Sequence, residues 1–476
     1  MFGLSSAGLA LAGFVLFCPL LATFSYLWVA LKVFRGKGLE YEHLRKYGSM
    51  VRVGPNYVLT DDPETIRQIN GARSIHHRDD WYRGAKLDPD TDTTISHRFA
   101  GPHDNYKAKA SFGYSGRDTI DFEVTVDEQI IHLIEVIKAQ HLSKPDQLNP
   151  LDFAHYIRYF TLDTITAVAF GKRFGFIEGG DLYGYTASIE KLLGLVATAG
   201  DVPLLRKIFI SPFVARFFAP KPTDSWGIGK VMGLAHETVE DRLKSKEKHS
   251  DMVSSFLRHG LTAKEIKAES LVQLMAGADT TATVIRTGML YLSTCPRVYQ
   301  RLREEMKEAI SSGKVSSPIR VDEAKQLPYL QAVIYESFRM RPPATYGFYK
   351  KVPPGGETYQ GKFLPEGTAI GSNFPAMVRL ESVFGQDSQR FRPERFLECS
   401  AEKKTDMIRV VELLFGYGRW QCAGKVLALV ELNKIFFELV RAFDWQVIYP
   451  GQAWDEEAFT ATVQKDLWMS ITEAST

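Results

Sequence analysis

The longest predicted helix constrains this 476-residue chain more than any other sequence feature. It runs from Leu261 to Thr294, with a capping box from Thr262 to Glu265 at its start and Pro296 just beyond its end. At about 1.5 Å per residue the helix would be about 50 Å long. That length is enough to cross a whole domain, so we expect the helix to run through the domain from side to side.

A second constraint is a short glycine-rich stretch from Phe415 to Gly424, which precedes an apolar helical run from Leu427 to Val440. Gly416 and Gly418 let the backbone turn tightly and approach a flat ligand closely. Cys422 lies just before the helix, where unpaired N–H groups and the positive end of the dipole favour a thiolate. A lone thiolate suits haem iron, because the porphyrin supplies four nitrogens and the protein need supply only one axial ligand. The alternative is an inert, buried cysteine at a helix start.

This stretch resembles the haem-binding loop of the cytochrome P-450 family, whose pattern is Phe-x-x-Gly-x-Arg-x-Cys-x-Gly. Four positions fall in register: Phe415, Gly418, Cys422 and Gly424. The resemblance implies that Cys422 is the axial ligand of haem b and that Phe415, Gly416 and Gly424 surround the haem. Trp420 stands where the family has arginine, and Arg419 precedes it. Either residue could contact a haem propionate, although an indole N–H donates one hydrogen bond and cannot neutralise a carboxylate.

The middle of the long helix carries a second motif, Ala276 to Thr281. Gly277 is a poor helix former and the Thr280 hydroxyl can bond a carbonyl one turn back, which together predict a local widening of the helix. The small side chains of Ala276 and Gly277 leave room for a ligand above the haem. Asp279 and Thr280 form an acid–alcohol pair able to deliver protons, and the resemblance identifies them with the family's proton-delivery motif. A packing glycine between solvated polar neighbours is the alternative.

A third motif lies on the predicted helix from Leu327 to Met340. Glu336 and Arg339 are three residues apart and share one face of a helix that is otherwise apolar. A buried ion pair needs further partners. The resemblance supplies Arg395, in the stretch Phe391 to Phe396, and implies a structural cluster that holds the haem-side core without touching substrate.

The resemblance also assigns two less distinctive groups. Pro102 begins a predicted helix on which His103 and Lys107 are four apart, and both would bond a propionate; an exposed helix face is the alternative. The segment after the Glu-x-x-Arg helix would line the substrate pocket through Ala344, Thr345, Tyr346 and Phe348. Core packing explains these four residues equally well.

The remaining pattern predicts a mainly α-helical protein with a small β-rich portion, which is the cytochrome P-450 fold. Strands are expected at 50–60 and in the Pro-Gly-rich segment 342–371, and helices over most of 118–260. A long loop is expected at 78–101. A net charge of +2 gives no reason to expect nucleic acid. The four cysteines show no paired spacing, so neither a disulfide framework nor a zinc site is indicated.

The first 31 residues contain no charged side chain, whereas Lys32, Arg35 and Lys37 follow at once. This pattern predicts a transmembrane anchor at 4–31, a short basic linker at 32–40 and a catalytic domain at 41–476. The positive-inside rule places that domain on the cytosolic face of the endoplasmic reticulum membrane, crossed once. A cleaved signal peptide is disfavoured, because its start would carry Lys or Arg and its apolar run would be shorter.

The resemblance implies a haem-thiolate monooxygenase of the fungal microsomal type, which oxidises a small apolar substrate in specialised metabolism. It would use haem b, O2 and NADPH electrons, delivered by cytochrome P-450 reductase with cytochrome b5 as a second donor. No flavin or nicotinamide motif is evident in this chain. Oxidative coupling, cyclisation or desaturation at the same haem is the first alternative, and a non-catalytic haem carrier or sensor is the second. Substrate identity and regiochemistry are not encoded in these motifs.

Overall fold

The computed structural model describes residues 46–474, except for positions 87, 89, 210, 212, 215, 216, 218 and 246. The predicted anchor at 4–31 and linker at 32–40 lie outside these residues. Within the described part of the chain, no helix combines the length and the apolar character needed to cross a membrane.

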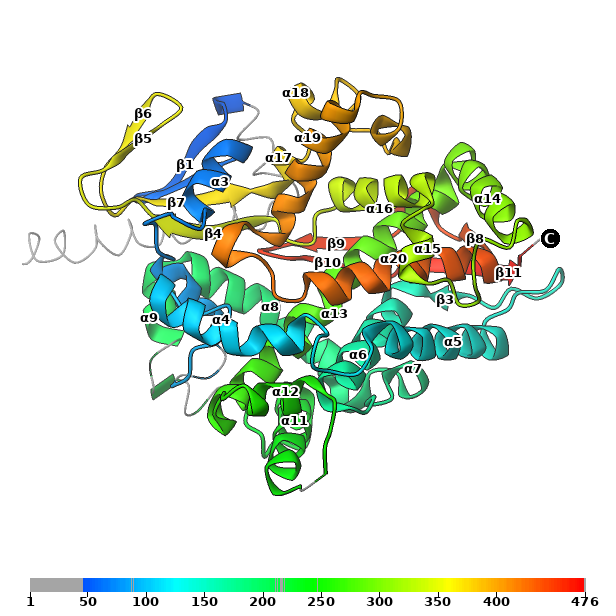
Figure 1. Cartoon of the computed structure of the whole chain (residues 1–476), viewed down its shortest axis with the longest axis horizontal. Coiled ribbons are helices and arrows are strands. Elements are labelled where there is room, and N and C mark those ends of the chain that lie inside the picture. Colours follow the sequence, from blue (N-terminus) through cyan, green and yellow to red (C-terminus); the bar gives the residue numbers. More distant parts are fainter. Residues whose placement is uncertain are drawn as a thin grey trace, which may run out of the picture.

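Helices make up most of the molecule and surround one long central helix, α13 (Ala263–Thr294) (Figure 1). Its neighbours are α6 (Phe153–Phe170), α11 (Gly227–Lys244), α16 (Pro328–Met340) and α20 (Lys425–Ala442). The other helices of eight or more residues are α3 (Pro63–Asn70), α4 (Ala100–Tyr114), α5 (Phe122–Gln140), α8 (Tyr185–Asp201), α14 (Pro296–Ser311) and α19 (Ala401–Glu412). Shorter helices are α7 (Phe176–Gly179), α9 (Pro203–Phe209), α12 (Met252–Arg258), α15 (Val321–Ala324), α17 (Phe374–Met377) and α18 (Glu381–Phe384).

The ends of α13 and α16 confirm the predictions made from capping residues and prolines. The Thr262 hydroxyl accepts from the Glu265 N–H at 3.3 Å, and the Glu265 carboxylate accepts from the Thr262 N–H at 2.7 Å. This reciprocal capping box satisfies two N–H groups that the first turn leaves without helical partners. Pro296 and Pro328 each occupy the first position of a helix, where a missing N–H costs nothing. The capping box thus fixes the start of α13, and the two prolines fix the starts of α14 and α16.

The sheet that contains β1, β4 and β7 lies to one side of the helices, whereas β8, β9, β10 and β11 run among them (Figure 1). One sheet has the order β1 (Met50–Gly54), β2 (Tyr57–Thr60), β7 (Ala369–Asn373), β4 (Tyr346–Lys351), in which only β2 and β7 are parallel. A second sheet has the order β3 (Leu151–Asp152), β11 (Trp468–Glu473), β8 (Phe443–Val447). Two separate two-stranded hairpins account for the remaining strands: β5 (Glu357–Tyr359) with β6 (Lys362–Leu364), and β9 (Asp455–Ala458) with β10 (Thr462–Lys465). The mainly α fold with a small β portion is confirmed.

The segment predicted as a long loop at 78–101 is irregular apart from one 3-10 turn, η1 (Asp80–Ala85). It is nevertheless held firmly. The buried Glu269 of α13 accepts hydrogen bonds from the Thr94 N–H at 3.0 Å and the Thr94 hydroxyl at 2.5 Å. Tyr106 and Tyr114 of α4 donate to the same carboxylate at 3.0 and 2.5 Å. Glu269 therefore joins this loop to both α4 and the central helix.

Candidate functional site: a haem-thiolate centre

Cys422 lies three residues before the first residue of α20, in a loop whose turns are made by glycines. Gly416 and Gly418 have positive φ values, +75° and +58°, and a Cβ on Gly418 would come within 2.6 Å of the Asn70 carbonyl oxygen. The Cys422 N–H donates to the Phe415 carbonyl at 2.6 Å, which closes the loop. The cysteine side chain keeps accessible surface although protein surrounds it, so its sulfur faces an internal space.

Burial and local hydrogen bonds act in opposite directions on the pKa of the Cys422 thiol. Burial raises the pKa of the thiol and outweighs the N–H groups of Gly424 and Lys425 and the charges of Lys107 and Lys425, which lower it. The helix-start N–H groups thus act in the predicted direction, towards the thiolate, but burial opposes them. A metal ion coordinated by the sulfur would displace this proton. The aligned N–H groups remain available to hydrogen-bond the coordinated sulfur.

The middle of α13 contains a small residue, Ala276, that is exposed where most of the helix is buried. It lies halfway along the helix, so it borders an internal space. Gly277 packs against α6, where an added Cβ would meet Ile165 at 3.0 Å. The Thr280 hydroxyl donates to the Ala276 carbonyl at 2.8 Å. The predicted widening is not observed: α13 is a regular α-helix throughout, because this hydroxyl bonds the carbonyl without displacing the backbone N–H.

Asp279 and Thr280 are adjacent in the sequence but have different partners. The Asp279 carboxylate accepts from the Arg158 guanidinium of α6 at 2.7 Å and lies 3.9 Å from Arg286. Arg158 also pairs with Glu190 of α8. Burial of Arg286 beside Arg158 lowers the pKa of Arg286 to about 9. The structure therefore ties the acid of the expected pair into an ion network, and the alcohol to its own helix.

Three buried side chains near the Cys422 loop each have an N–H donor without a hydrogen-bond acceptor. Lys350 of β4 is fully buried, its Nζ makes no hydrogen bond, and it lies 3.4 Å from the centre of the Trp420 ring. The Arg78 guanidinium stacks 4.4 Å from the same ring, and its Nε has no acceptor. The Trp420 indole N–H is also unpaired. Burial and the neighbouring Arg78 and Arg419 charges hold the pKa of Lys350 well below its usual range. Desolvated donors of this kind call for an anionic group.

The predicted propionate ligands are placed as follows. His103 is buried and lies against Trp420, with ring centroids 4.3 Å apart; burial and Arg78 lower the pKa of His103 to about 3. The Lys107 ammonium donates to the carbonyls of Arg419 and Gln421 at 2.8 and 2.5 Å. Arg419 pairs with Asp104 at 2.6 Å. Lys107 therefore braces the loop, whereas Arg419 pairs with Asp104 and also keeps a buried, unpaired Nε–H, as Arg78, Lys350 and Trp420 keep unpaired donors.

These residues fit a haem. Cys422 offers one sulfur ligand towards an internal space, and Arg78, Lys350 and Trp420 offer unpaired N–H groups suited to two carboxylates. Sequence reasoning missed Arg78 and Lys350. Strand alternation does not single out Lys350, because the register of β4 shifts between Gly347 and Lys350.

The Glu336 cluster lies together behind the site. The Glu336 carboxylate accepts from Arg339 of the same helix at 2.7 Å and from Arg395 at 3.1 Å. All three side chains are buried, and both arginines also donate to backbone carbonyls, among them those of Val378 and Phe384. Removal of one member of a buried ion cluster typically costs about 3–5 kcal/mol, because the remaining charge is left without a partner.

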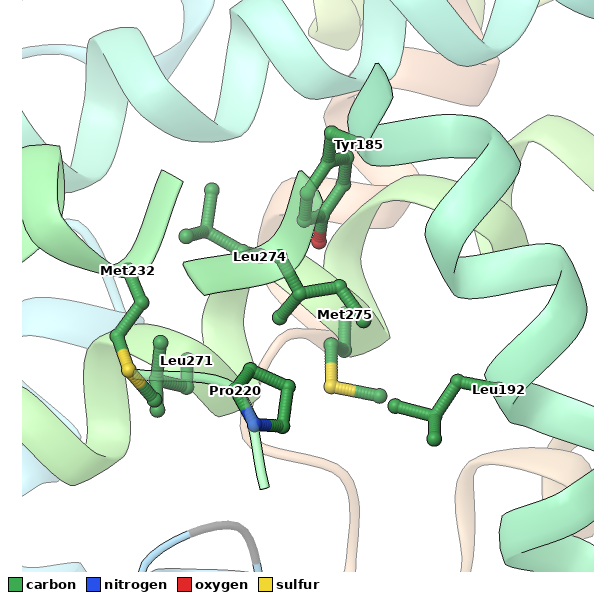
Figure 2. Close-up of a pocket in the computed structure, with 8 residues that line it drawn as sticks. Tyr185, Leu192, Pro220, Met232, Leu271, Leu274 and Met275 are labelled. Carbon is green, nitrogen blue, oxygen red and sulfur yellow. The ribbon is translucent and has the colours of Figure 1, made fainter. Parts of the chain in front are cut away.

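An apolar pocket opens between α8, α11 and α13 (Figure 2). Its wall includes Tyr185, Leu192, Met232, Leu271, Leu274 and Met275. The four residues predicted to line a substrate pocket do not contribute to it. Tyr346 donates to Asp201 at 3.0 Å, Thr345 to the Phe459 carbonyl, Ala344 bridges to Ala461, and Phe348 packs against Trp81. Its α13 residues end at Met275, one position before Ala276 in the sequence.

A mostly helical fold with a cysteine sulfur beside buried, unpaired cationic donors defines a haem-thiolate protein. The chain belongs to the cytochrome P-450 family, whose model matches residues 106–468. It is similar to the cytochrome P-450 monooxygenase aba1 of Botryotinia fuckeliana, with 43% identity over 95% of this chain and 90% of that protein. It is also similar to ABA1 of Pyricularia oryzae (41% identity, 96% and 91%) and to abl1 of Leptosphaeria maculans (39% identity, 93% and 80%). The chain is thus a haem-thiolate monooxygenase that uses haem b, O2 and NADPH electrons supplied by a reductase.

Proposed function

We propose that this chain is a membrane-tethered monooxygenase that oxidises a small apolar molecule in fungal specialised metabolism. The observation that carries the proposal is Cys422, whose sulfur faces an internal space at the start of α20. Haem bound there supplies reductive activation of dioxygen. The chain's own residues bind and orient: Arg78, Lys350 and Trp420 hold the carboxylate edge, and the apolar pocket excludes water from the substrate. The names of the similar fungal monooxygenases support the oxidase class and leave the substrate open.

The test of this proposal is the absorption of the reduced protein with carbon monoxide. The purified protein should show the red-shifted Soret band that a thiolate ligand produces, and Cys422→Ala should lose it because no second sulfur can replace the ligand. Cys399→Ala removes a free, partly buried cysteine elsewhere in the molecule and is the matched control. A normal band in Cys422→Ala would contradict the assignment. Isotopically labelled dioxygen then distinguishes oxygen insertion from coupling, cyclisation or desaturation.

We propose that Asp279 and Thr280 deliver protons to the haem site. The Thr280 hydroxyl donates to the Ala276 carbonyl, next to the internal space that Ala276 borders. Asp279 can exchange protons with that space only if its bond to Arg158 opens. The proposal therefore gives the direct contact to Thr280, and Asp279 would act through movement of a side chain.

The membrane tether is supported by two observations. The first 31 residues carry no charge. Exposed apolar side chains also gather in and beside α9, where Leu204 and Ile208 are about half exposed and Phe213 and Phe217 lie 5.2 Å apart, ring to ring. Contiguous exposed apolar surface favours contact with lipid or protein.

The tether and its orientation can be measured in one experiment. In microsomes the full chain should resist extraction with alkaline carbonate, because an apolar helix remains in the hydrocarbon core. Protease added from the cytosolic side should digest the residues after the linker. Release of the chain by carbonate would contradict the tether, and full protection from protease would contradict the orientation.

A further inference from the structure

Tyr185, the first residue of α8, carries the only polar side-chain group among the described residues that line the pocket. Only 4% of Tyr185 is exposed, and its ring lies 6.1 Å from that of Phe176. Its hydroxyl points towards Leu274 and Met275 of α13 (Figure 2). The other residues named above as lining the pocket are leucines and methionines, which offer no strong hydrogen-bonding group.

The Tyr185 hydroxyl is buried without a hydrogen-bond partner among the described residues. Other buried tyrosines are paired: Tyr106 and Tyr114 donate to Glu269, and Tyr329 donates to Glu394 at 2.7 Å. A buried hydroxyl without a partner is destabilising, so a paired or apolar side chain would be more stable at this position. The cost is offset if a ligand supplies the missing partner.

The surroundings leave this hydroxyl as a neutral donor. Burial, and then the Asp279 charge, raise the pKa of Tyr185, while Arg158 lowers it. Asp279 accepts from Arg158 and is not bonded to this hydroxyl, while Arg158 keeps one buried guanidinium nitrogen without an acceptor. The donor is therefore free to meet an acceptor that arrives with the substrate.

We propose that the substrate is a hydrocarbon skeleton with one oxygen acceptor and that Tyr185 donates a hydrogen bond to this oxygen. The inference rests on the proposed function, since it concerns the pocket of the same enzyme. Tyr185 is then the specificity-determining contact, because every other wall residue selects only for apolar surface. Met232 and Met275 are flexible and fit the remainder of an irregular skeleton.

The test compares Tyr185→Phe, which keeps the ring and removes the hydroxyl, with the wild type. Two probes are titrated into the haem-loaded full chain by calorimetry: 2-dodecanone, which carries one carbonyl acceptor, and dodecane, which carries none. The substitution should weaken ketone binding about five- to tenfold, which is the value of one neutral hydrogen bond, and should leave alkane binding within about twofold. Tyr159→Phe is the matched control, since Tyr159 is a buried tyrosine of the neighbouring α6 that does not line the pocket.

A second measurement separates a ligand contact from a structural role. Without ligand, Tyr185→Phe should be at least as stable to heat as the wild type, because it removes an unpaired buried hydroxyl. Equal weakening of both probes, no change for the ketone, no ketone binding to the wild type, or a lower melting temperature would each overturn the inference. The carbon monoxide spectrum of the same samples reports on the proposed function independently. If that spectrum is normal and the affinities do not change, only the assignment of Tyr185 fails.

Discussion

Lys350 shows how a single residue can reveal the chemistry of an absent partner. Its ammonium is fully buried, lies beside the Arg78 and Arg419 charges and has no acceptor. In the protein alone this arrangement is unfavourable, since charge is taken out of water and set among like charges. A carboxylate beside Lys350 and Arg78 would remove both penalties. Trp420, which stands where the family has arginine, would then supply only a hydrogen bond and a ring face. The positive charge would come from Lys350 of β4 and from Arg78, which precedes η1.

Replacement of Lys350 by Met should therefore weaken haem binding while sparing the fold. A hydrogen bond to a charged group is worth about 1.5–3 kcal/mol, so we expect haem affinity to fall about 10- to 100-fold. Transfer of haem to apomyoglobin measures this loss without any turnover. Lys351→Met is the matched control, because Lys351 instead pairs with Asp80 at 2.9 Å. Equal haem loss from the two variants would show that Lys350 has no special role.

The burial of Lys350 also shows where strand periodicity fails. The register of β4 against β7 shifts between Gly347 and Lys350, and Phe348 has a positive φ of 54°. Tyr349 and Lys350 are consequently both buried, although strict alternation would place them on opposite faces. A bulge of this kind has no marker in the sequence apart from the glycine. Strand periodicity therefore does not predict the burial of Lys350, whereas the prediction for Cys422 rests on a local pattern of residues.

At the scale of elements, the sequence predicted well what local chemistry decides. The capping box at Thr262 and the prolines at 296 and 328 set the ends of α13, α14 and α16 to within two residues. The predicted widening around Gly277 failed for a different reason. Gly277 is needed for the close approach of α6, where Ile165 occupies the space of a Cβ. A glycine in a helix thus indicates a packing contact as readily as a change of helical geometry.

At the scale of the whole molecule, contacts between distant segments decide what local patterns cannot. Asp201 at the end of α8 accepts from the Trp81 indole of η1 at 2.8 Å and from the Tyr346 hydroxyl of β4 at 3.0 Å. A Cβ on Gly84 would lie 3.0 Å from Gly200, so η1 and α8 are in close contact. Nothing in the separate segments predicts this junction. Tyr346, which sequence reasoning assigned to substrate, is used here to join β4 to the helix that carries Tyr185.

The Asp201 junction should make stability depend on pH in a defined direction. Burial raises the pKa of Asp201 to about 7, against which the bonds from Trp81 and Tyr346 and the charge of Arg206 act only partly. The folded chain therefore retains a proton between about pH 4 and about pH 7 that the unfolded chain has released. The contribution of Asp201 to the free energy of unfolding is therefore fully present below the unfolded pKa of about 4, and it is lost as the pH rises through the folded pKa of about 7.

Replacement of Asp201 by Asn removes the titration, so the loss of stability between roughly pH 5 and pH 8 should shrink by about 2–3 kcal/mol relative to the wild type. Urea unfolding followed by tryptophan fluorescence across this range measures the difference. Asp61→Asn is the comparison variant: burial raises the pKa of Asp61 only to about 6, so its effect should be complete about one pH unit lower. Parallel pH profiles of the wild type and Asp201→Asn would show that the carboxyl is already ionised in the folded state. The junction between η1, α8 and β4 would then be held by an anion, and its strength would not change as the pH rises through neutrality.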